Sequence, residues 1–167
     1  MFVLGAATVL GVVAVLGLMP HGSRTTTANG PGDRPDKPAP RPTVLVRQSR
    51  LGPILTDAQG RTLYLFNDDK DGRSHCFGGC AQVWPPALVS GTPRPGRGVS
   101  AAKLSTIQRG RSKRQLAYNG HPLYRLDADA RPGQMQGEGF LGTWWVVSPA
   151  GKLVVAPGLK VSRGGGY

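Results

Sequence analysis

The sequence predicts an all-β domain in which two pseudo-symmetric antiparallel β-repeats pack as one sandwich or barrel-like unit, with short helical turns. Two observations carry this prediction. The chain repeats itself at a fixed spacing, and each repeat holds hairpin signals without the pattern of a long amphipathic helix. A length of 167 residues fits one modest domain.

The repeat is clearest where "GRTLYLFNDD" at residues 60–69 is compared with "GHPLYRLDAD" at residues 120–129. The spacing of 60 residues continues without a gap to Trp84 and Trp144. A spacing kept over this distance indicates an internal duplication, with repeats at about residues 51–90 and 111–150.

Three hairpins are expected. Residues 57–60 form a turn between two apolar runs, Asn119-Gly120 is a strong two-residue hairpin signal, and residues 148–151 form a third turn. Short helical turns are expected at "CAQVW" and at "SAAKLSTI". All the remaining regular structure of the folded part is expected to be β-strand.

Side chains in the strands should alternate between two faces. Tyr64 and Phe66 are expected on one face and Leu63 and Leu65 on the other, and the second repeat has the same alternation. Aromatic residues at matching places of a duplicated sheet usually fill its core. Trp84 and Trp144 are therefore expected to be core residues, and the alternative is an exposed aromatic pair in a ligand groove.

The N-terminal part of the chain lies outside the repeats. Residues 2–19 are apolar and uncharged, so residues 1–20 are expected to be a signal peptide or a retained membrane anchor, with uncleaved anchoring favoured. Residues 21–42 are rich in Pro, Gly and Thr, which is typical of a disordered linker. The folded domain is expected at residues 43–160, followed by a flexible tail at 161–167.

The repeated segments carry a motif that a known family shares. "YLFNDD" supplies Tyr64, Phe66 and Asp69 of a Y-x-[FWY]-x-x-D pattern, and "YRLDAD" supplies Tyr124 and Asp129, with Leu126 in place of the aromatic. "CFGGCAQVWPP" and "YNGHPLY" are similar to other stretches typical of the same family. The chain thus resembles the bacterial secreted-repeat family of predicted lipoproteins, a resemblance that implies export but no activity. No Cys for lipidation follows the apolar segment.

The motif residues allow two interpretations. Tyr64 with Asp69, and Tyr124 with Asp129, could form a paired recognition site. Alternatively each Asp caps the turn after its strand, and each Tyr packs its ring in the core with a locally bonded hydroxyl. Duplication favours the structural interpretation, because repeats retain what folding needs.

The only two cysteines, Cys76 and Cys80, are expected to form a disulfide, because export favours oxidation and the "FGG" between them is pliable. The corresponding places of the second repeat hold Gln136 and Phe140. The fold therefore does not require cysteines there, and any chemistry of this pair belongs to the first repeat alone.

Metal binding at the cysteines is the main alternative. Covalent haem attachment needs His directly after the second Cys, where Ala81 stands, and zinc needs four ligands. Two thiolates with an imidazole from His75 or His121 would suit copper(I). A copper-binding or thiol-redox module is therefore the runner-up function.

Calcium is a weaker alternative. Asn67, Asp69, Asp71 and Gly72 follow the start of a D-x-[DN]-x-[DN]-G loop, but the twelfth place is Gly78 instead of a bidentate Glu. The second repeat loses the pattern. A solvated acidic turn is the competing interpretation.

The sequence gives little support for nucleic-acid binding or for enzymatic activity. From Thr43 onward there are 17 Lys and Arg against 7 Asp and Glu, which suits an anionic envelope, while no nucleic-acid motif is present. The chain has one Glu, Glu138, and no hydrolase or phosphate-binding motif. We expect no enzyme and no resident cofactor. The expected protein is an extracytoplasmic, membrane-tethered or secreted domain that binds an unknown envelope component or serves as a scaffold.

Overall fold

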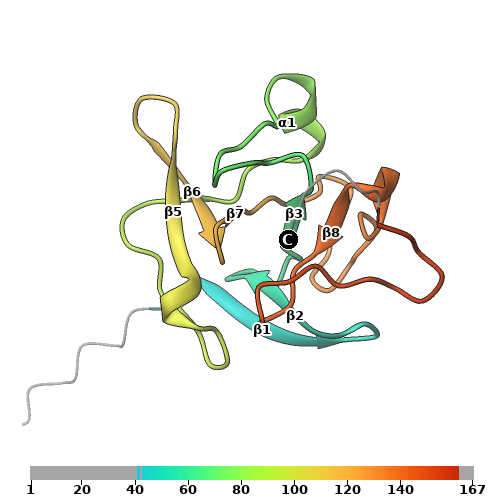
Figure 1. Cartoon of the computed structure of the whole chain (residues 1–167). Helices are drawn as coiled ribbons and strands as arrows, with labels where there is room; N and C mark the ends of the chain where they lie inside the picture. The colour runs from blue at the N-terminus through green and yellow to red at the C-terminus, as the bar shows by residue number, and fades with distance from the viewer. Residues whose placement is uncertain (1–40, 42, 162–167) are drawn as a thin grey trace, which may run out of the picture. The chain divides into compact units, whose positions relative to one another are not determined.

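The computed structural model describes residues 41 and 43–161. The described residues belong to a single compact unit that is mostly strands, shown in Figure 1. The elements are, in chain order, β1 Val44–Ser49, β2 Gly52–Asp57, β3 Tyr64–Phe66, α1 Gly79–Val83, β4 Leu88–Val89, η1 Ala101–Lys103, β5 Leu104–Arg109, β6 Lys113–Tyr118, β7 His121–Pro122, η2 Phe140–Gly142 and β8 Trp144–Val146.

Within the described residues, no helix is long and apolar enough to cross a membrane. The apolar segment at 1–20 lies outside these residues. So do the expected linker, apart from Arg41, and the expected tail, apart from Val161.

Each repeat opens with an antiparallel hairpin. β1 pairs with β2 from Val44↔Asp57 to Ser49↔Gly52, and β5 pairs with β6 from Leu104↔Tyr118 to Arg109↔Lys113. β5 begins 60 residues after β1, so the spacing found in the sequence extends to these strands. Both β1 and β5 lie before the starts expected for the repeats, about residues 51 and 111.

The expected turns are present. The backbone N–H of Gly60 donates to the carbonyl of Asp57, and that of Gly151 donates to the carbonyl of Ser148. Asn119 and Gly120 have φ angles of 51° and 84° and join β6 to β7 in an antiparallel pair. These positive φ values at both central residues are those of a type I′ hairpin turn, which explains the Asn-Gly sequence.

Both expected helical turns also form, over shorter spans. α1 falls on the "CAQVW" stretch, whereas η1 covers only three residues of "SAAKLSTI" before β5 begins at Leu104. The β-rich duplicated architecture is confirmed, and its sheets do not close into a barrel. Figure 1 shows β3 and β8 side by side near the middle, with the β1–β2 and β5–β6 hairpins at the periphery.

The last strand of each repeat pairs with the other repeat. β8, from the second repeat, lies antiparallel to β3 of the first, with Tyr64 opposite Val146. In the reciprocal place, Pro86 from the first repeat lies opposite Tyr124 of the second. Because 86 and 146 are 60 residues apart, like 64 and 124, the two pairings are pseudo-symmetric. The repeats are thus interleaved rather than stacked as separate units.

Two buried apolar clusters lie on opposite faces of the motif strands, as the alternation predicts. Leu63, Leu65 and Leu123 belong to one cluster with Trp145. Tyr64 and Tyr124 belong to the other, which also contains Trp84 and Trp144 and has Phe66 and Leu126 packed against it.

Candidate functional site at the interface of the repeats

The two motif tyrosines meet where the repeats join. The backbone N–H of Tyr64 donates to the carbonyl of Tyr124, and the N–H of Tyr124 donates to the carbonyl of Tyr64, both at 2.9 Å. This reciprocal pair is a single antiparallel bridge, and both side chains are fully buried. The local twofold relation between the repeats therefore passes between these two residues.

Each tyrosine hydroxyl is bound by the aspartate of the other repeat. The Tyr64 hydroxyl donates to Oδ2 of Asp129 at 2.5 Å, and the Tyr124 hydroxyl donates to Oδ2 of Asp69 at 2.7 Å. Both interpretations of the sequence paired each Tyr with its own repeat or with local atoms. The observed pairs instead cross between the repeats.

The second oxygen of each carboxyl group closes a loop. Oδ1 of Asp69 accepts the backbone N–H of His75 at 2.7 Å, and Oδ1 of Asp129 accepts that of Gln136 at 3.0 Å. Each Asp therefore holds the loop that follows its own strand while it binds the tyrosine of the other repeat. The same two side chains fix local loop geometry and the contact between repeats.

Burial changes the acidity of these groups. The pKa of Tyr64 and that of Tyr124 are raised far above the usual phenol value, first by desolvation and then by the neighbouring carboxyl groups. Desolvation raises the pKa of Asp69 to about 6, although hydrogen bonds from the His75 amide and from Tyr124 favour its ionised form. The tyrosines thus remain protonated donors at any ordinary pH.

The two repeat-equivalent tryptophans stack on each other. The rings of Trp84 and Trp144 lie 3.9 Å apart at an angle of 3°, and each side chain is 3% exposed. Tyr64 meets Trp84 edge-on, and Tyr124 meets Trp144 edge-on in the same way. This buried geometry corresponds to the core placement rather than to an exposed aromatic ligand groove.

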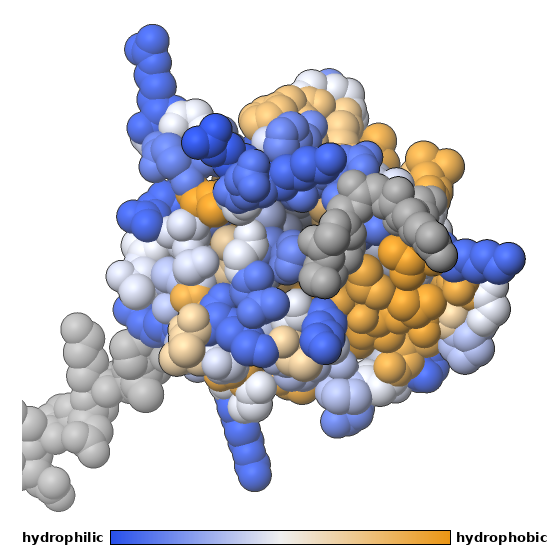
Figure 2. Space-filling view, in the orientation of Figure 1, coloured by the Kyte–Doolittle hydropathy of each residue, from blue (hydrophilic) through white to orange (hydrophobic). Residues whose placement is uncertain are grey.

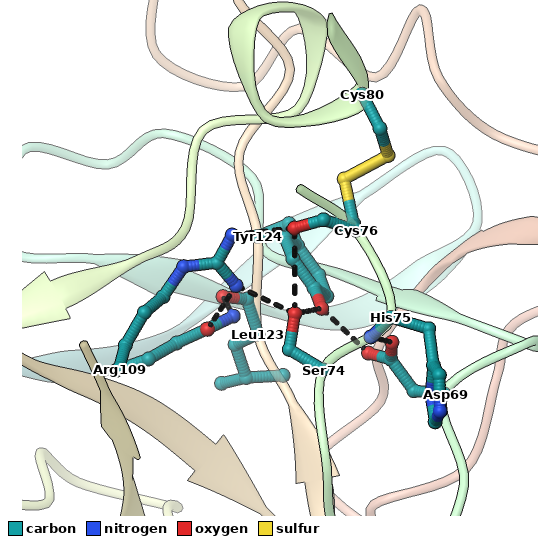
Figure 3. Close-up of a disulfide and its surroundings, with 9 residues drawn as sticks. Asp69, Ser74, His75, Cys76, Cys80, Arg109, Leu123 and Tyr124 are labelled. Carbon is teal, nitrogen blue, oxygen red and sulfur yellow. Dashed lines mark hydrogen bonds between the residues drawn. A yellow bond between two sulfur atoms is a disulfide. The ribbon is translucent and has the colours of Figure 1, made fainter. Parts of the chain in front are cut away.

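The expected disulfide between Cys76 and Cys80 is formed, with the Cα atoms 5.3 Å apart. Figure 3 shows that it joins the start of α1 to the loop that Asp69 holds. Cys76 is fully buried and Cys80 is partly exposed. The bond therefore fixes the first-repeat loop between the buried motif and the surface.

A polar network surrounds the disulfide, also visible in Figure 3. Arg109 donates to the Ser74 hydroxyl at 2.5 Å, to Oε1 of Gln115 at 2.8 Å, and to the carbonyl of Cys76. The Ser74 hydroxyl is in turn hydrogen-bonded to that of Tyr124 at 2.7 Å. A continuous chain of hydrogen bonds thus connects the disulfide loop to the Tyr124–Asp69 pair.

The site related to this one by the repeat lacks the network. Ser49 ends β1 where Arg109 ends β5, and its hydroxyl donates to the nearby carbonyl of Gly52. Where Arg109 fills the first-repeat loop, the equivalent place is a hollow of about 400 Å³ lined in part by Arg47, Arg50 and Gln134. The asymmetry expected from the cysteines therefore extends to an arginine.

The residues proposed for metals are placed as follows. His75 is exposed and His121 is half-buried, while Asn67 is buried and Asp71 is exposed. Both oxygens of Asp69 already accept hydrogen bonds. Among the described residues, no group of three or more His, Cys, Asp or Glu side chains is arranged to hold a metal ion.

Sequence reasoning missed Arg109, Ser74 and Gln115 as members of this network. The one available signal was the repeat itself, which aligns a charged Arg109 with a small Ser49 and a polar Gln115 with an apolar Leu55. Where two repeats otherwise match, a difference of this kind marks the site that has acquired additional contacts.

Comparison with known proteins gives one match. A family model described as a secreted repeat of unknown function matches residues 45–88 and again residues 105–148, which together make up more than half of the chain. Neither the curated proteins nor the solved structures include a significant match. The two matched segments coincide with the two interleaved repeats.

Proposed function

Because the chain belongs to the family of secreted repeats of unknown function, we propose that it is an exported, non-catalytic β-domain with a structural or binding role in the cell envelope. Export is the property that the family carries. The structural role, the absence of catalysis and the envelope setting are our proposals.

The observation that carries the proposal is the use of the motif side chains. Tyr64 and Tyr124 bind Asp129 and Asp69 inside the domain, and the two tryptophans stack between the repeats. Catalytic and binding groups need access to a ligand, whereas these groups are directed at each other. A motif that joins the repeats supports a rigid module that presents its outer surface to a partner.

We propose in addition that the domain is tethered to the membrane by residues 1–20. The length and apolar character of residues 2–19 support this proposal. The Pro-rich segment that follows would then act as a spacer between the bilayer and the folded repeats.

The intact mass of the exported protein, with and without thiol alkylation, tests the proposed export and the proposed tether together. We expect a mass that includes residues 1–20 and no alkylation unless a reductant is added first, because export oxidises Cys76 and Cys80. A mass that lacks residues 1–20 would show cleavage after the apolar segment and would contradict the proposed tether. Thiols that react without reduction would contradict export to an oxidising compartment.

The disulfide is expected to stabilise the domain without being essential to its fold. Closing a loop of this size contributes on the order of 2 kcal/mol in the chain-entropy view. A Cys76→Ser, Cys80→Ser variant should therefore fold with the same circular dichroism spectrum and a lower melting temperature. The second repeat forms its corresponding loop without cysteines, which supports this expectation.

Thiol-redox or copper chemistry at this pair is the second candidate. One observation favours it: Cys80 is partly exposed at the surface, where the thiol of a partner could reach it. Copper(I) would require reduction of the disulfide, with His75 as the nearest imidazole in sequence. Titration of the reduced protein with copper(I) tests this candidate, and absence of bound metal would contradict it.

A further inference from the structure

We propose that the surface formed by α1, Leu88 and the tip of the β5–β6 hairpin docks onto an anionic phospholipid bilayer. Below, this surface is called the basic–apolar face, and it comprises Phe77, Val83, Leu88, Arg109, Arg111 and Lys113. The inference rests on the proposed function, in which the exported domain is held next to the membrane.

The first support is the segregation of charge along the chain. Residues 72–126 contain nine Lys and Arg and not a single Asp or Glu. This span includes α1, β4, β5 and β6, so the basic side chains of the hairpin have no acidic residue on any of these neighbouring elements. The acidic residues of the folded part lie before and after the span.

The second support is the exposure of large apolar side chains within the same span. Phe77 is 60% exposed, Val83 is 49% exposed and Leu88 is 41% exposed. All three lie on or next to α1 and β4. Large apolar side chains exposed on neighbouring elements of a small domain are typical of an interaction surface.

The apolar and basic residues share one hollow. A depression of about 430 Å³ is lined both by the apolar Phe77, Pro86 and Leu88 and by the basic Arg109, Arg111 and Lys113. The guanidinium carbon of Arg109 lies 4.7 Å from the centre of the Phe77 ring. Figure 2 shows the apolar surface over α1 next to the hydrophilic side chains at the β5–β6 hairpin.

This combination matches the interface of a bilayer. Aromatic and aliphatic side chains insert at the level of the acyl-chain boundary, while Lys and Arg beside them bind anionic headgroups. Each basic residue near such a surface contributes about a fivefold gain in binding. A soluble polyanion would engage the basic residues but would leave Phe77 and Val83 in water, so the exposed apolar side chains favour the bilayer.

The test is amide hydrogen exchange on the full-length chain reconstituted into vesicles. One set of vesicles contains equal parts phosphatidylcholine and phosphatidylglycerol, and the other contains phosphatidylcholine alone. Because any insertion of residues 1–20 occurs in both sets, only domain docking distinguishes them. We expect slower exchange at residues 77–83 and 109–114 on the anionic vesicles, and loss of this difference at high salt.

Matched charge variants locate the surface. Arg111→Glu with Lys113→Glu should reduce the protection at both segments by an order of magnitude or more. Arg47→Glu with Arg50→Glu makes the same change of net charge at two exposed positions of the β1–β2 hairpin and should leave the protection intact. Phe77→Ser should weaken docking, whereas Leu141→Ser, another exposed apolar position, should not.

Three results would overturn the proposal. Equal exchange on both vesicle types would exclude anionic lipid, and equal sensitivity to the two pairs of charge variants would exclude this face. Protection of residues 109–114 alone, reproduced by soluble dextran sulfate, would assign the face to a polyanion instead. Each of these results leaves the disulfide and intact-mass test of export unaffected, so failure here is distinguishable from failure of the proposed function.

Discussion

At the scale of single residues, the aspartates of the motif have two simultaneous roles. Asp69 and Asp129 each bind the tyrosine of the opposite repeat and an amide N–H of their own loop. The Asp five positions after the Tyr of each motif thus serves loop closure as well as pairing between the repeats.

The raised pKa of Asp69 predicts a specific pH dependence. Its pKa in the folded state is about 6, above the ordinary 3.8, so between these values the folded state binds more protons than the unfolded state. The contribution of Asp69 to stability is therefore greatest at acidic pH and falls as the pH rises through this window. Asp69→Asn has no carboxyl group at this position, so it lacks this contribution to the pH dependence of stability.

Urea denaturation at pH 4 and pH 7 measures this effect. The free energy of unfolding of the wild type, relative to that of Asp69→Asn, should decrease from the lower to the higher pH. Asp68→Asn, at the exposed neighbouring position, serves as the control and should follow the wild type. A relative stability that rises with pH would show that the carboxyl group is not held in the protonated form.

At the scale of elements, the hairpins were predictable and the loops were not. Asn119-Gly120 and the alternation around Tyr64 predict local backbone geometry, because turns and strand faces depend on neighbouring residues. The loop contacts depend on residues far apart in sequence, such as Tyr64 with Gly137. No local pattern encodes a contact of this kind.

The loop after Asp129 approaches the tryptophan stack closely enough to require glycine. A Cβ atom at Gly137 would lie 2.4 Å from Trp84 Cη2 and 3.0 Å from Tyr64 Cε1. We predict that Gly137→Ala lowers the free energy of unfolding by about 1–3 kcal/mol through overpacking. Thermal or urea unfolding measures the loss.

Gly79 provides a matched control for this substitution. It begins α1, its φ is also outside the positive range, and a Cβ atom there would meet nothing within 4 Å. Gly79→Ala should leave stability unchanged or raise it slightly, since alanine favours helix. Equal losses for the two variants would mean that the loop does not pack against the stack as described.

At the scale of the whole molecule, the repeats form one folding unit. The duplication and the β class could be predicted from the 60-residue spacing, but that spacing equally fits two separate small sheets. Which strand pairs with which is decided by long-range packing. The exchange of β8 and of residues 84–87 between the repeats became evident only in three dimensions.

Interleaving predicts that neither repeat folds alone. Residues 43–98 and 99–161, prepared separately, should each lack cooperative unfolding, because each is missing the strand that completes its sheet. Mixed in equal amounts, they should regain the spectrum of the intact domain in a concentration-dependent manner. Circular dichroism during titration follows this recovery, and a cooperative melt of either fragment alone would contradict it.

A double-mutant cycle on the motif tests the pairing of Tyr and Asp across the repeats most directly. Tyr64→Phe is combined with Asp129→Asn across the repeats and, separately, with Asp69→Asn within the repeat, and the free energies of unfolding are compared. We predict a coupling of about 1 kcal/mol or more for Tyr64 with Asp129, which share a hydrogen bond. For Tyr64 with Asp69, which share no partner, we predict additivity within about 0.5 kcal/mol. Strong coupling within the repeat and none across it would contradict the interleaved structure on which the proposed function rests.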